Sequence, residues 1–498
     1  MSNESAKTTN GGRLPTGATG AAAGVVAPSL RLENELADKK PLYSAAEARA
    51  EAERCLYCVD APCIKACPTE IDIPTFIKKI ASGNVRGSAK TIFEQNLLGY
   101  SCARVCPVEV LCVGDCVYNG WGRDPIQIGR LQRFATETAT AAVKGGAAPV
   151  MKRHVDIGRA SKKVACIGAG PASLAFAGYL ALEGHQAVVF EKKAVAGGLN
   201  TTGIAPYKLH ADDAVHEVEF VQSLGVEVVT GVEVGDSDGA GRISGKKLLD
   251  TYDAVFLGVG LGADTSLGIA GEDGPGVYGA TAWIEKMKLA MTTSDKGEIA
   301  GKTVVVVGGG NTAIDVAREC AQLGALHVAM LYRRGAEHMS GYAHEMEGAR
   351  IDGVRLVTNV QPVAFVREGA SESERATGKL LALRVAKTDE NAKPIAGTEH
   401  DIPCDMVALA IGQSKLRDVA KQLPGVELDK RGCVACDPKN GQTGNPKVFA
   451  GGDCINGGKE VVNAVADGRN AARTLLERWA TSSASSVLSG TKSGASAE

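Results

Sequence analysis

The stretch from residue 163 to residue 191 constrains the fold of this chain more strongly than any other part of its sequence. Residues 164–167 form an apolar run of strand length, residues 172–182 have the apolar spacing of a helix packed on a sheet, and residues 187–190 form a second buried strand that ends at Glu191. A turn of small residues joins the first strand to the helix. In such a unit the glycines let the backbone approach a pyrophosphate, the helix N-terminus faces its charge, and the acidic residue binds ribose hydroxyls. We therefore predict a dinucleotide site that uses Gly168, Gly170, Pro171, Ala172 and Glu191.

The composition excludes several classes of protein. A length of 498 residues is enough for about three domains, and a net charge of −2 gives no reason to expect nucleic acid or an anionic membrane as a partner. No apolar run approaches the roughly 18 residues of a membrane span, and the N-terminus lacks a signal-peptide core. Fourteen cysteines without an export signal indicate metal or redox chemistry rather than disulfides, so we expect a cytoplasmic protein.

Eight of the fourteen cysteines lie between residues 55 and 116, in two groups that each include a Cys-Pro pair. The first group is Cys55, Cys58, Cys63 and Cys67, and the second is Cys102, Cys106, Cys112 and Cys116. Cys-Pro pairs are typical of bacterial ferredoxins, whose cysteines hold iron–sulfur clusters. Structural zinc sites also use the CxxC spacing of the first group, so the spacing leaves both hypotheses open. A flavin domain directly downstream favours clusters, because zinc cannot accept electrons.

Residues 303–334 repeat the opening motif, with a strand, a G-x-G-x-x-A turn, a helix and a second strand. No acidic residue ends the second strand of this repeat, and Arg333 and Arg334 stand there instead. An acid would repel a ribose 2′-phosphate whereas arginines would pair with it, so the repeat predicts NADP(H) in preference to NAD(H). A solvated basic turn is the alternative interpretation. The nicotinamide nucleotide is expected to bind Gly308, Gly310, Asn311, Thr312, Ala313, Arg333 and Arg334.

Three segments of the chain read C-L-Y-C-V-D-A-P-C-I-K-A-C-P-T, L-G-Y-S-C-A-R-V-C-P-V-E-V-L-C-V-G-D-C and P-I-Q-I-G-R-L-Q-R-F-A-T-E. They resemble the N-terminal half of dihydropyrimidine dehydrogenase. They are equally similar to the separate electron-input subunit of the two-subunit bacterial enzyme. The small subunit of NADPH-dependent glutamate synthase resembles the chain more distantly but shares the whole architecture. The resemblance runs from about residue 42 to residue 479.

The resemblance implies two [4Fe-4S] clusters with interleaved ligands. One cluster would be held by Cys55, Cys58, Cys63 and Cys116. The other would be held by Cys67, Cys106, Cys112 and the side-chain oxygen of Gln132, with Cys102 as a neighbour rather than a ligand.

Further segments are expected to complete an FAD site. The glycine turn at residues 196–199 lets backbone lie close to a flavin, through Gly197, Gly198 and Leu199. By resemblance, Lys208 would lie beside the flavin ring system, and Gly452 with Asp453 would lie near the ribityl chain.

The predicted fold class is α/β, with an α-helical double iron–sulfur domain followed by two Rossmann-like domains, the NAD(P) domain being inserted into the FAD domain. Residues 405–412 mirror residues 252–260 and are expected to return the chain to the FAD domain. The expected divisions are a disordered tail at 1–29, the iron–sulfur domain at 30–158, the FAD domain at 159–298 and 405–481, the NAD(P) domain at 299–404 and a disordered tail at 482–498.

The resemblance implies an electron-input subunit of an oxidoreductase. It would pass electrons from NAD(P)H through FAD and the two clusters to an FMN-containing partner subunit that reduces uracil and thymine. Two alternatives stay open, namely the small subunit of glutamate synthase and a non-enzymatic nucleotide-binding scaffold with structural zinc. Hydride transfer between stacked rings depends on orientation, so we expect no catalytic side chain. We expect a hetero-oligomer and neither nucleic acid nor membrane as a partner.

Overall fold

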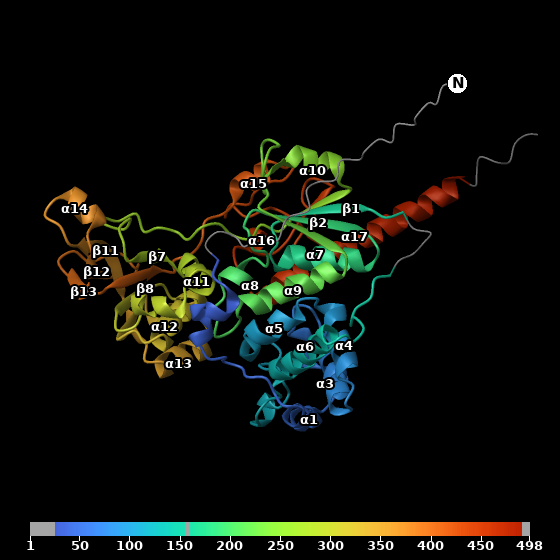
Figure 1. Ribbon diagram of the computed structural model, residues 1–498, viewed down its shortest axis with the longest axis horizontal. Helices are drawn as coiled ribbons and strands as arrows, with labels where there is room; N and C mark the ends of the chain where they lie inside the picture. Colours follow the sequence, from blue (N-terminus) through green and yellow to red (C-terminus); the bar gives the residue numbers. More distant parts are fainter. Residues whose placement is uncertain (1–24, 155–159, 491–498) are drawn as a thin grey trace, which may run out of the picture.

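The computed structural model describes residues 25–154 and 160–490, in which a helical segment precedes two parallel sheets (Figure 1). This arrangement confirms the predicted α/β fold class, with a helical segment ahead of two Rossmann-type sheets. The helical segment contains α1 (Ala45–Glu53), α2 (Pro62–Lys65), α3 (Ile73–Ala81), α4 (Val85–Gln95), α5 (Gly99–Val105) and α6 (Ile128–Lys144).

Helix α3 illustrates how the sequence forms this segment. The Asp72 side chain accepts a hydrogen bond from the backbone N–H of Thr75 at 3.1 Å, which caps the first turn. Apolar residues at helical spacing then form one buried face, namely Ile73, Phe76, Ile77 and Ile80. The helix therefore packs as one wall of the helical segment.

The first sheet consists of five parallel strands in the order β15-β6-β1-β2-β3. Its strands are β1 (Lys163–Ile167), β2 (Gln186–Glu191), β3 (Val226–Thr230), β6 (Ala254–Leu257) and β15 (Val448–Ala450). The helices that follow them are α7 (Pro171–Leu182), α8 (Leu199–Thr202), α9 (Ala211–Ser223), α10 (Gly245–Thr251), α15 (Arg417–Lys421), α16 (Asp453–Asn456) and α17 (Val461–Gly490). Helix α7 is buried on all sides after its first residue, and its Phe176 ring stacks on Phe256 of β6 at 4.4 Å.

The second sheet also has five parallel strands, in the order β10-β9-β8-β14-β7. Its strands are β7 (Val277–Gly279), β8 (Thr303–Val307), β9 (His327–Tyr332), β10 (Arg355–Thr358) and β14 (Met406–Leu409). The helices of this sheet are α11 (Ala280–Leu289), α12 (Asn311–Gln322) and α13 (Ala343–Ile351). The predicted second strand–helix–strand unit is present as β8, α12 and β9.

One prediction about this sheet is wrong. Residues 405–412 were expected to return the chain to the first sheet, but β14 pairs with β8 in the second. Strand β6 pairs with β1 in the first sheet in the same way, so the two segments are equivalents in different sheets. The similarity of their sequences reflects this equivalence. Because β7 also belongs to the second sheet, that sheet extends beyond the expected 299–404 on both sides.

Smaller elements complete the described chain. A three-stranded antiparallel sheet at one end of the molecule contains β11 (Val360–Arg367), β12 (Leu380–Lys387) and β13 (His400–Pro403) (Figure 1). Helix α14 (Glu372–Thr377) follows β11 and precedes β12 in the chain. Strands β4 (Glu233–Gly235) and β5 (Arg242–Ser244) form a separate parallel pair. No helix among residues 25–154 and 160–490 is long and apolar enough to cross a membrane.

The expected tails need a partial correction. Residues 25–29 were placed in the N-terminal tail, but Val26 donates a backbone hydrogen bond to Leu289 at 2.7 Å, and the nearby Leu32 is fully buried against the second sheet. Helix α17 continues to Gly490, past the expected end at residue 481. The rest of both tails, 1–24 and 491–498, lies outside the described residues.

The helical segment shares one hydrophobic core with the first sheet. Buried side chains form a continuous cluster from α3 and α4 through α7 to β6. Leu97 of the helical segment packs directly against Gly178 of α7, because a Cβ atom added to Gly178 would lie only 2.7 Å from the Leu97 Cδ1 atom. The predicted cluster ligands and the predicted FAD turn are therefore carried by one packed body.

Candidate functional site

Four cysteines of the helical segment line one cavity, here called cavity 1. They are Cys55, Cys58, Cys63 and Cys116, the set that the resemblance assigned to the first cluster. Much of the remaining lining is apolar. Burial raises the pKa of the Cys55 thiol, and burial together with the neighbouring thiols raises the pKa of Cys63 to about 12. Leu56 lines the cavity and is 46% exposed, so cavity 1 lies close to the surface.

A second cavity, here called cavity 2, is lined by the other predicted ligands and by Cys102. These ligands are Cys67, Cys106, Cys112 and Gln132. The Gln132 amide nitrogen donates to the Gly99 carbonyl oxygen at 2.8 Å, which fixes the orientation of the amide. The Cys102 thiol is hydrogen-bonded to that of Cys106, and this contact together with burial raises the pKa of Cys106 well above its usual value. Cys102 and Gln132 thus border the same space.

The two cavities fit iron–sulfur clusters better than single metal ions. Among the described residues, no group of three or more His, Cys, Asp or Glu side chains is arranged to hold one metal ion. Zinc would draw four thiolate sulfurs to about 2.3 Å from one point, whereas these thiols are distributed around a space.

The two cavities are neighbours, and cavity 2 also contacts a helix that packs on the first sheet. Ile73 lines both cavities, and burial together with the thiols of Cys106, Cys67 and Cys63 raises the pKa of Cys112. Val462 of α17 also lines cavity 2. Cavity 2 is therefore bordered by helix α17, which packs on the first sheet, whereas the lining of cavity 1 includes the exposed Leu56.

The predicted first dinucleotide turn lies at the carboxyl end of β1. Gly168 has a φ of +87°, and a Cβ atom there would lie 2.8 Å from the carbonyl oxygen of Gly258. The Ala169 N–H donates to the Glu191 carboxylate at 2.8 Å, so this acid holds the turn from the end of β2. Gly170 precedes the first turn of α7, where Pro171 and Ala172 follow. Sequence reasoning missed Gly258, although the glycine that ends β6 was the available signal.

Two other predicted FAD segments meet this turn. A Cβ atom on Gly198 would lie 2.8 Å from the Gly170 Cα atom, and one on Gly452 would lie 3.1 Å from the Ala172 Cβ atom. Leu199 begins α8 and Asp453 begins α16, each directly after its glycine. Burial raises the pKa of the Asp453 carboxyl. The turns at 168–172, 197–199 and 452–453 thus surround one region at the carboxyl ends of the parallel strands, where such folds bind ligands.

The second nucleotide turn repeats this construction at the carboxyl end of β8. Gly308 has a φ of +149°, and a Cβ atom there would lie 2.4 Å from the Ala410 carbonyl oxygen. Gly310 precedes α12, and the Asn311 side-chain oxygen accepts from the Tyr342 N–H at 2.9 Å. Thr312 is half-buried and Ala313 is fully buried in the same first turn. The turn therefore has the close backbone approach that a pyrophosphate site requires.

Arg333 and Arg334 directly follow β9, and both are exposed. The Arg334 guanidinium lies 5.7 Å from the centre of the Tyr332 ring. Within the part of the chain that the structure describes, neither guanidinium has an ion-pair partner. The Ser340 hydroxyl would lie 3.5 Å from a Cβ atom on Gly310, so residue 340 borders the same turn.

Lys208 occupies a different setting from the other predicted FAD residues. Its ammonium lies 2.7 Å from the Asp315 carboxylate of α12 and 3.2 Å from the Glu345 carboxylate of α13. Although burial opposes the charge, these two carboxylates raise the pKa of Lys208. The structure thus shows Lys208 as a buried link between the two nucleotide sheets, whereas its contact with a flavin stays a prediction.

Buried polar residues that the sequence did not single out join the three parts of the molecule. Lys288 of α11 donates to the carbonyl oxygens of three residues that follow the glycine turn at 196–199, namely Asn200, Ile204 and Leu209. Burial lowers the pKa of Lys288 to about 8. The Glu217 carboxylate of α9 accepts from the Ser101 N–H of α5 at 3.0 Å, and burial raises the pKa of Glu217 to about 7. These charges position the segments around the predicted FAD site.

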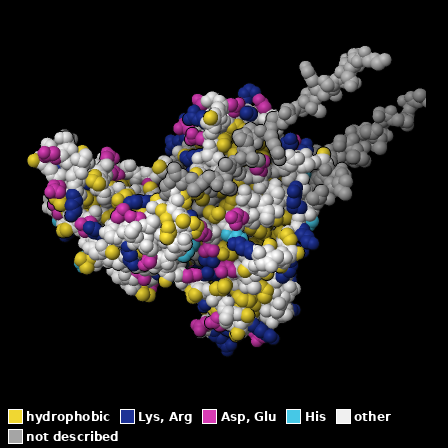
Figure 2. Space-filling model, in the orientation of Figure 1, with side chains coloured by type: hydrophobic (Ala, Val, Ile, Leu, Met, Phe, Trp, Pro, Cys, Tyr) yellow, Lys and Arg dark blue, Asp and Glu magenta, His cyan; other side chains and the backbone are white. Residues whose placement is uncertain are grey.

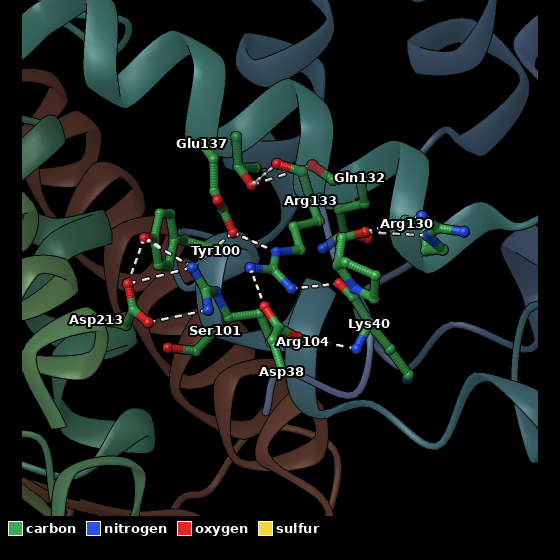
Figure 3. Close-up of polar contacts among 12 residues, drawn as sticks. Asp38, Lys40, Tyr100, Ser101, Arg104, Arg130, Gln132, Arg133, Glu137 and Asp213 are labelled. Atoms are coloured by element: carbon green, nitrogen blue, oxygen red, sulfur yellow. Dashed lines mark hydrogen bonds and ion pairs between the residues drawn. The ribbon is translucent and has the colours of Figure 1, made fainter. Parts of the chain in front are cut away.

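An ion-pair network lies beside Ser101, the partner of Glu217 (Figure 3). The Arg104 guanidinium of α5 lies 2.9 Å from Asp213 of α9 and 2.7 Å from Glu137 of α6. Glu137 also pairs with Arg133, the residue after Gln132. Helices α5 and α6, which border cavity 2, are thereby connected to α9, which packs beside the first sheet.

The outer surface has a mixed charge. Lys and Arg side chains are intermixed with Asp and Glu over the visible face of the molecule (Figure 2), in keeping with the net charge of −2.

The fold and the site define a pyridine nucleotide oxidoreductase that carries an iron–sulfur domain. Residues 32–144 match the family model described as dihydropyrimidine dehydrogenase domain II, 4Fe-4S cluster, and residues 162–468 match the pyridine nucleotide-disulphide oxidoreductase model. The cofactors that these domains imply are [4Fe-4S] clusters, FAD and NADP(H). When bound, the flavin accepts two electrons as a hydride and the clusters carry electrons singly.

The chain belongs to the glutamate synthase small-subunit family of these enzymes. It is 36% identical over 448 residues to the glutamate synthase [NADPH] small chain of Halomonas elongata, covering 87% of this chain and 91% of that one. It is 32% identical over 444 residues to the NAD-dependent dihydropyrimidine dehydrogenase subunit PreT of Escherichia coli, covering 89% and 97%. Lactococcus lactis thioredoxin reductase matches its fold with a TM-score of 0.50 and 18% identity, over 64% of this chain and 100% of that one.

Proposed function

We propose that this chain is the electron-input subunit of a two-subunit pyrimidine reductase. It takes hydride from NADPH onto FAD, passes electrons through the clusters of cavity 2 and cavity 1, and delivers them to an FMN-containing partner subunit that reduces uracil and thymine. The observation that carries this proposal is the shared core, because the predicted FAD turn and both thiol-lined cavities belong to one packed body. The N-terminal match to a dihydropyrimidine dehydrogenase domain supports the choice of substrate.

The small chain of a glutamate synthase is the second candidate. A specific observation favours it, because the 36% identity to a glutamate synthase small chain extends over nearly the full length of that relative. In this case the partner would use the electrons to form glutamate from 2-oxoglutarate and glutamine.

We further propose the binding residues in three sets. Cavity 1 holds a cluster through Cys55, Cys58, Cys63 and Cys116, and cavity 2 holds one through Cys67, Cys106, Cys112 and Gln132. FAD contacts Gly168, Gly170, Pro171, Ala172, Glu191, Gly197, Gly198, Leu199, Lys208, Gly452 and Asp453. The nicotinamide nucleotide contacts Gly308, Gly310, Asn311, Thr312, Ala313, Arg333 and Arg334.

The test is the substrate requirement of the purified holoprotein. We expect the chain alone to reduce a dye with NADPH but to turn over neither uracil nor thymine, and adding the FMN-containing subunit of dihydropyrimidine dehydrogenase should restore pyrimidine reduction. Uracil reduction by the isolated chain would refute the subunit role. Glutamate formation with an added glutamate synthase large chain, but no pyrimidine reduction with the FMN subunit, would select the second candidate. A protein with two zinc ions, no iron and no flavin spectrum would be a scaffold instead.

A further inference from the structure

Asn96 places a buried amide without a protein partner at the wall of cavity 2. The residue is fully buried and lines the cavity, and among the described residues neither Oδ1 nor Nδ2 has a hydrogen-bonding partner. Its backbone is satisfied, because its N–H donates to Ile92 at 2.8 Å and its carbonyl accepts from Gly99 at 3.0 Å. Buried polar groups are nearly always paired, so an unpaired amide facing a cavity indicates a partner inside that cavity.

The backbone around Asn96 is tied to the proposed ligand set. The Gly99 N–H donates to the Asn96 carbonyl oxygen, and the Gly99 carbonyl oxygen accepts from the Gln132 amide at 2.8 Å. The turn at residues 96–99 is thus fixed relative to Gln132. Helix α5 begins at Gly99, contains Cys102 and is followed directly by Cys106. A side chain held in this way keeps one distance from whatever occupies the cavity.

The chemistry of the cavity decides what the partner is. A bound water would need two to four polar partners, but besides the two amides the lining consists of thiols and apolar groups. A [4Fe-4S] cluster would present sulfur atoms to every wall, and sulfur accepts hydrogen bonds. Hydrogen bonds to the sulfurs are one of the features that set the potential of such clusters.

We propose that the Asn96 side chain donates a hydrogen bond from Nδ2 to a sulfur of the cavity 2 cluster and thereby raises the reduction potential of that cluster. Reduction adds one negative charge to the cluster, and a donor stabilises the more negative form more strongly. Asn96 would be a tuning residue rather than a ligand. The proposal rests on the proposed function, because it requires the cluster assigned to cavity 2.

The test is Asn96→Leu, which removes the donor at similar volume. Each cluster's midpoint potential is measured by an EPR-monitored redox titration of the holoprotein, and iron content is measured beside it. We expect eight irons per chain in both proteins and a cavity 2 cluster whose reduction is about tenfold less favourable, which is a midpoint about 59 mV lower for a one-electron couple. The cavity 1 cluster in the same molecule is the internal control and should not shift.

Ser88→Ala is the matched control variant. Ser88 is buried in α4 and donates to the Phe76 carbonyl at 2.9 Å, but it lines neither cavity. It should leave both potentials unchanged. An unchanged cavity 2 potential in Asn96→Leu, or an equal shift of both clusters, would overturn the inference.

A second measurement covers the case in which Asn96→Leu fails to assemble its cluster. In wild-type protein labelled with ¹⁵N in the asparagine side-chain amide, pulsed EPR should detect ¹⁵N coupled to the reduced cavity 2 cluster, since Asn96 is the only asparagine that lines this cavity in the described structure. Absence of that coupling would overturn the inference. A chain with fewer than eight irons in its wild-type form would instead refute the proposed function.

Discussion

Replacing Arg333 and Arg334 by alanine tests whether the turn after β9 selects NADPH. Both side chains are exposed directly after β9, whose last residue Tyr332 lies against the turn that begins α12, since a Cβ atom on Gly309 would lie 2.6 Å from the Tyr332 ring. The structure describes no competing carboxylate beside either guanidinium. They are therefore free to meet a 2′-phosphate, which NADPH carries and NADH lacks.

The size of the expected effect follows from the exposure of these side chains. A hydrogen bond to a charged group contributes about 1.5–3 kcal/mol, and each 1.4 kcal/mol is about tenfold in affinity. Exposure to solvent and salt weaken such contacts, so we use the lower part of this energy range for the two arginines. We expect the double variant to raise the KM for NADPH by roughly 10- to 100-fold. The KM for NADH should change little, because its pyrophosphate uses the turn from Gly308 to Ala313.

The assay measures kcat/KM for both nucleotides with a dye acceptor, at low and at high salt. The NADPH defect should shrink as salt rises, because wild-type binding then loses the same attraction. Arg350→Ala is the matched control, since Arg350 is an exposed arginine of α13 that pairs with Glu347. If wild type prefers NADH, or if the double variant loses both nucleotides equally, the arginines are a solvated turn or a shared clamp and do not select NADP.

Two further predictions concern cavity 2 and the junction with α9. Cys106→Ser should remove about four irons and leave the cavity 1 cluster, whereas Cys102→Ser should leave the iron content unchanged. If Cys102→Ser removes a cluster and Gln132→Ala does not, Cys102 rather than Gln132 is the fourth ligand of the cavity 2 cluster. The pKa of Glu217, raised to about 7 by burial, should make the folded chain less stable as pH rises from about 5 to 8, because the folded form binds the extra proton below pH 7. Glu217→Gln keeps an acceptor for Ser101 but cannot bind the extra proton. The loss of unfolding free energy between pH 5 and 8 should therefore be smaller in this variant, by about 1.4 kcal/mol for each unit by which the pKa is raised. Thermal midpoints of both proteins across that pH range measure the difference. Equal slopes in both proteins would contradict it.

The sequence predicted the parts of this fold that depend on local pattern. Both strand–helix–strand units are present, because strand length, a turn of small residues and helical spacing are all encoded within about 30 residues. The sheet to which a short buried strand belongs is not encoded locally. Met406–Leu409 and Ala254–Leu257 have similar sequences, but they pair with different central strands. That choice is made by packing over the whole domain.

The residues that join the helical segment and the two sheets could not be predicted from the sequence either. Glu217 lies in a helix with an ordinary amphipathic pattern, and its partner Ser101 is 116 positions away. Lys288 pairs with carbonyl oxygens about 80 to 90 positions away. A buried charge that pairs with backbone has no motif of its own, so only the packed structure reveals it. Asn96 likewise attracts notice only once its amide is seen to be buried without a partner.

The surroundings of the two cavities give the proposed electron path a direction. Cavity 2 adjoins α17, and its lining includes the proposed ligand Gln132 and the proposed donor Asn96, both of which would favour the reduced form of a cluster. Cavity 1 has four thiols and Asp115 in its lining, which favour the oxidised form. We therefore expect an electron that leaves the flavin to rest in cavity 2, shielded by the shared core. Transfer to cavity 1, whose lining reaches the surface at Leu56, would then be completed when a docked partner removes the electron.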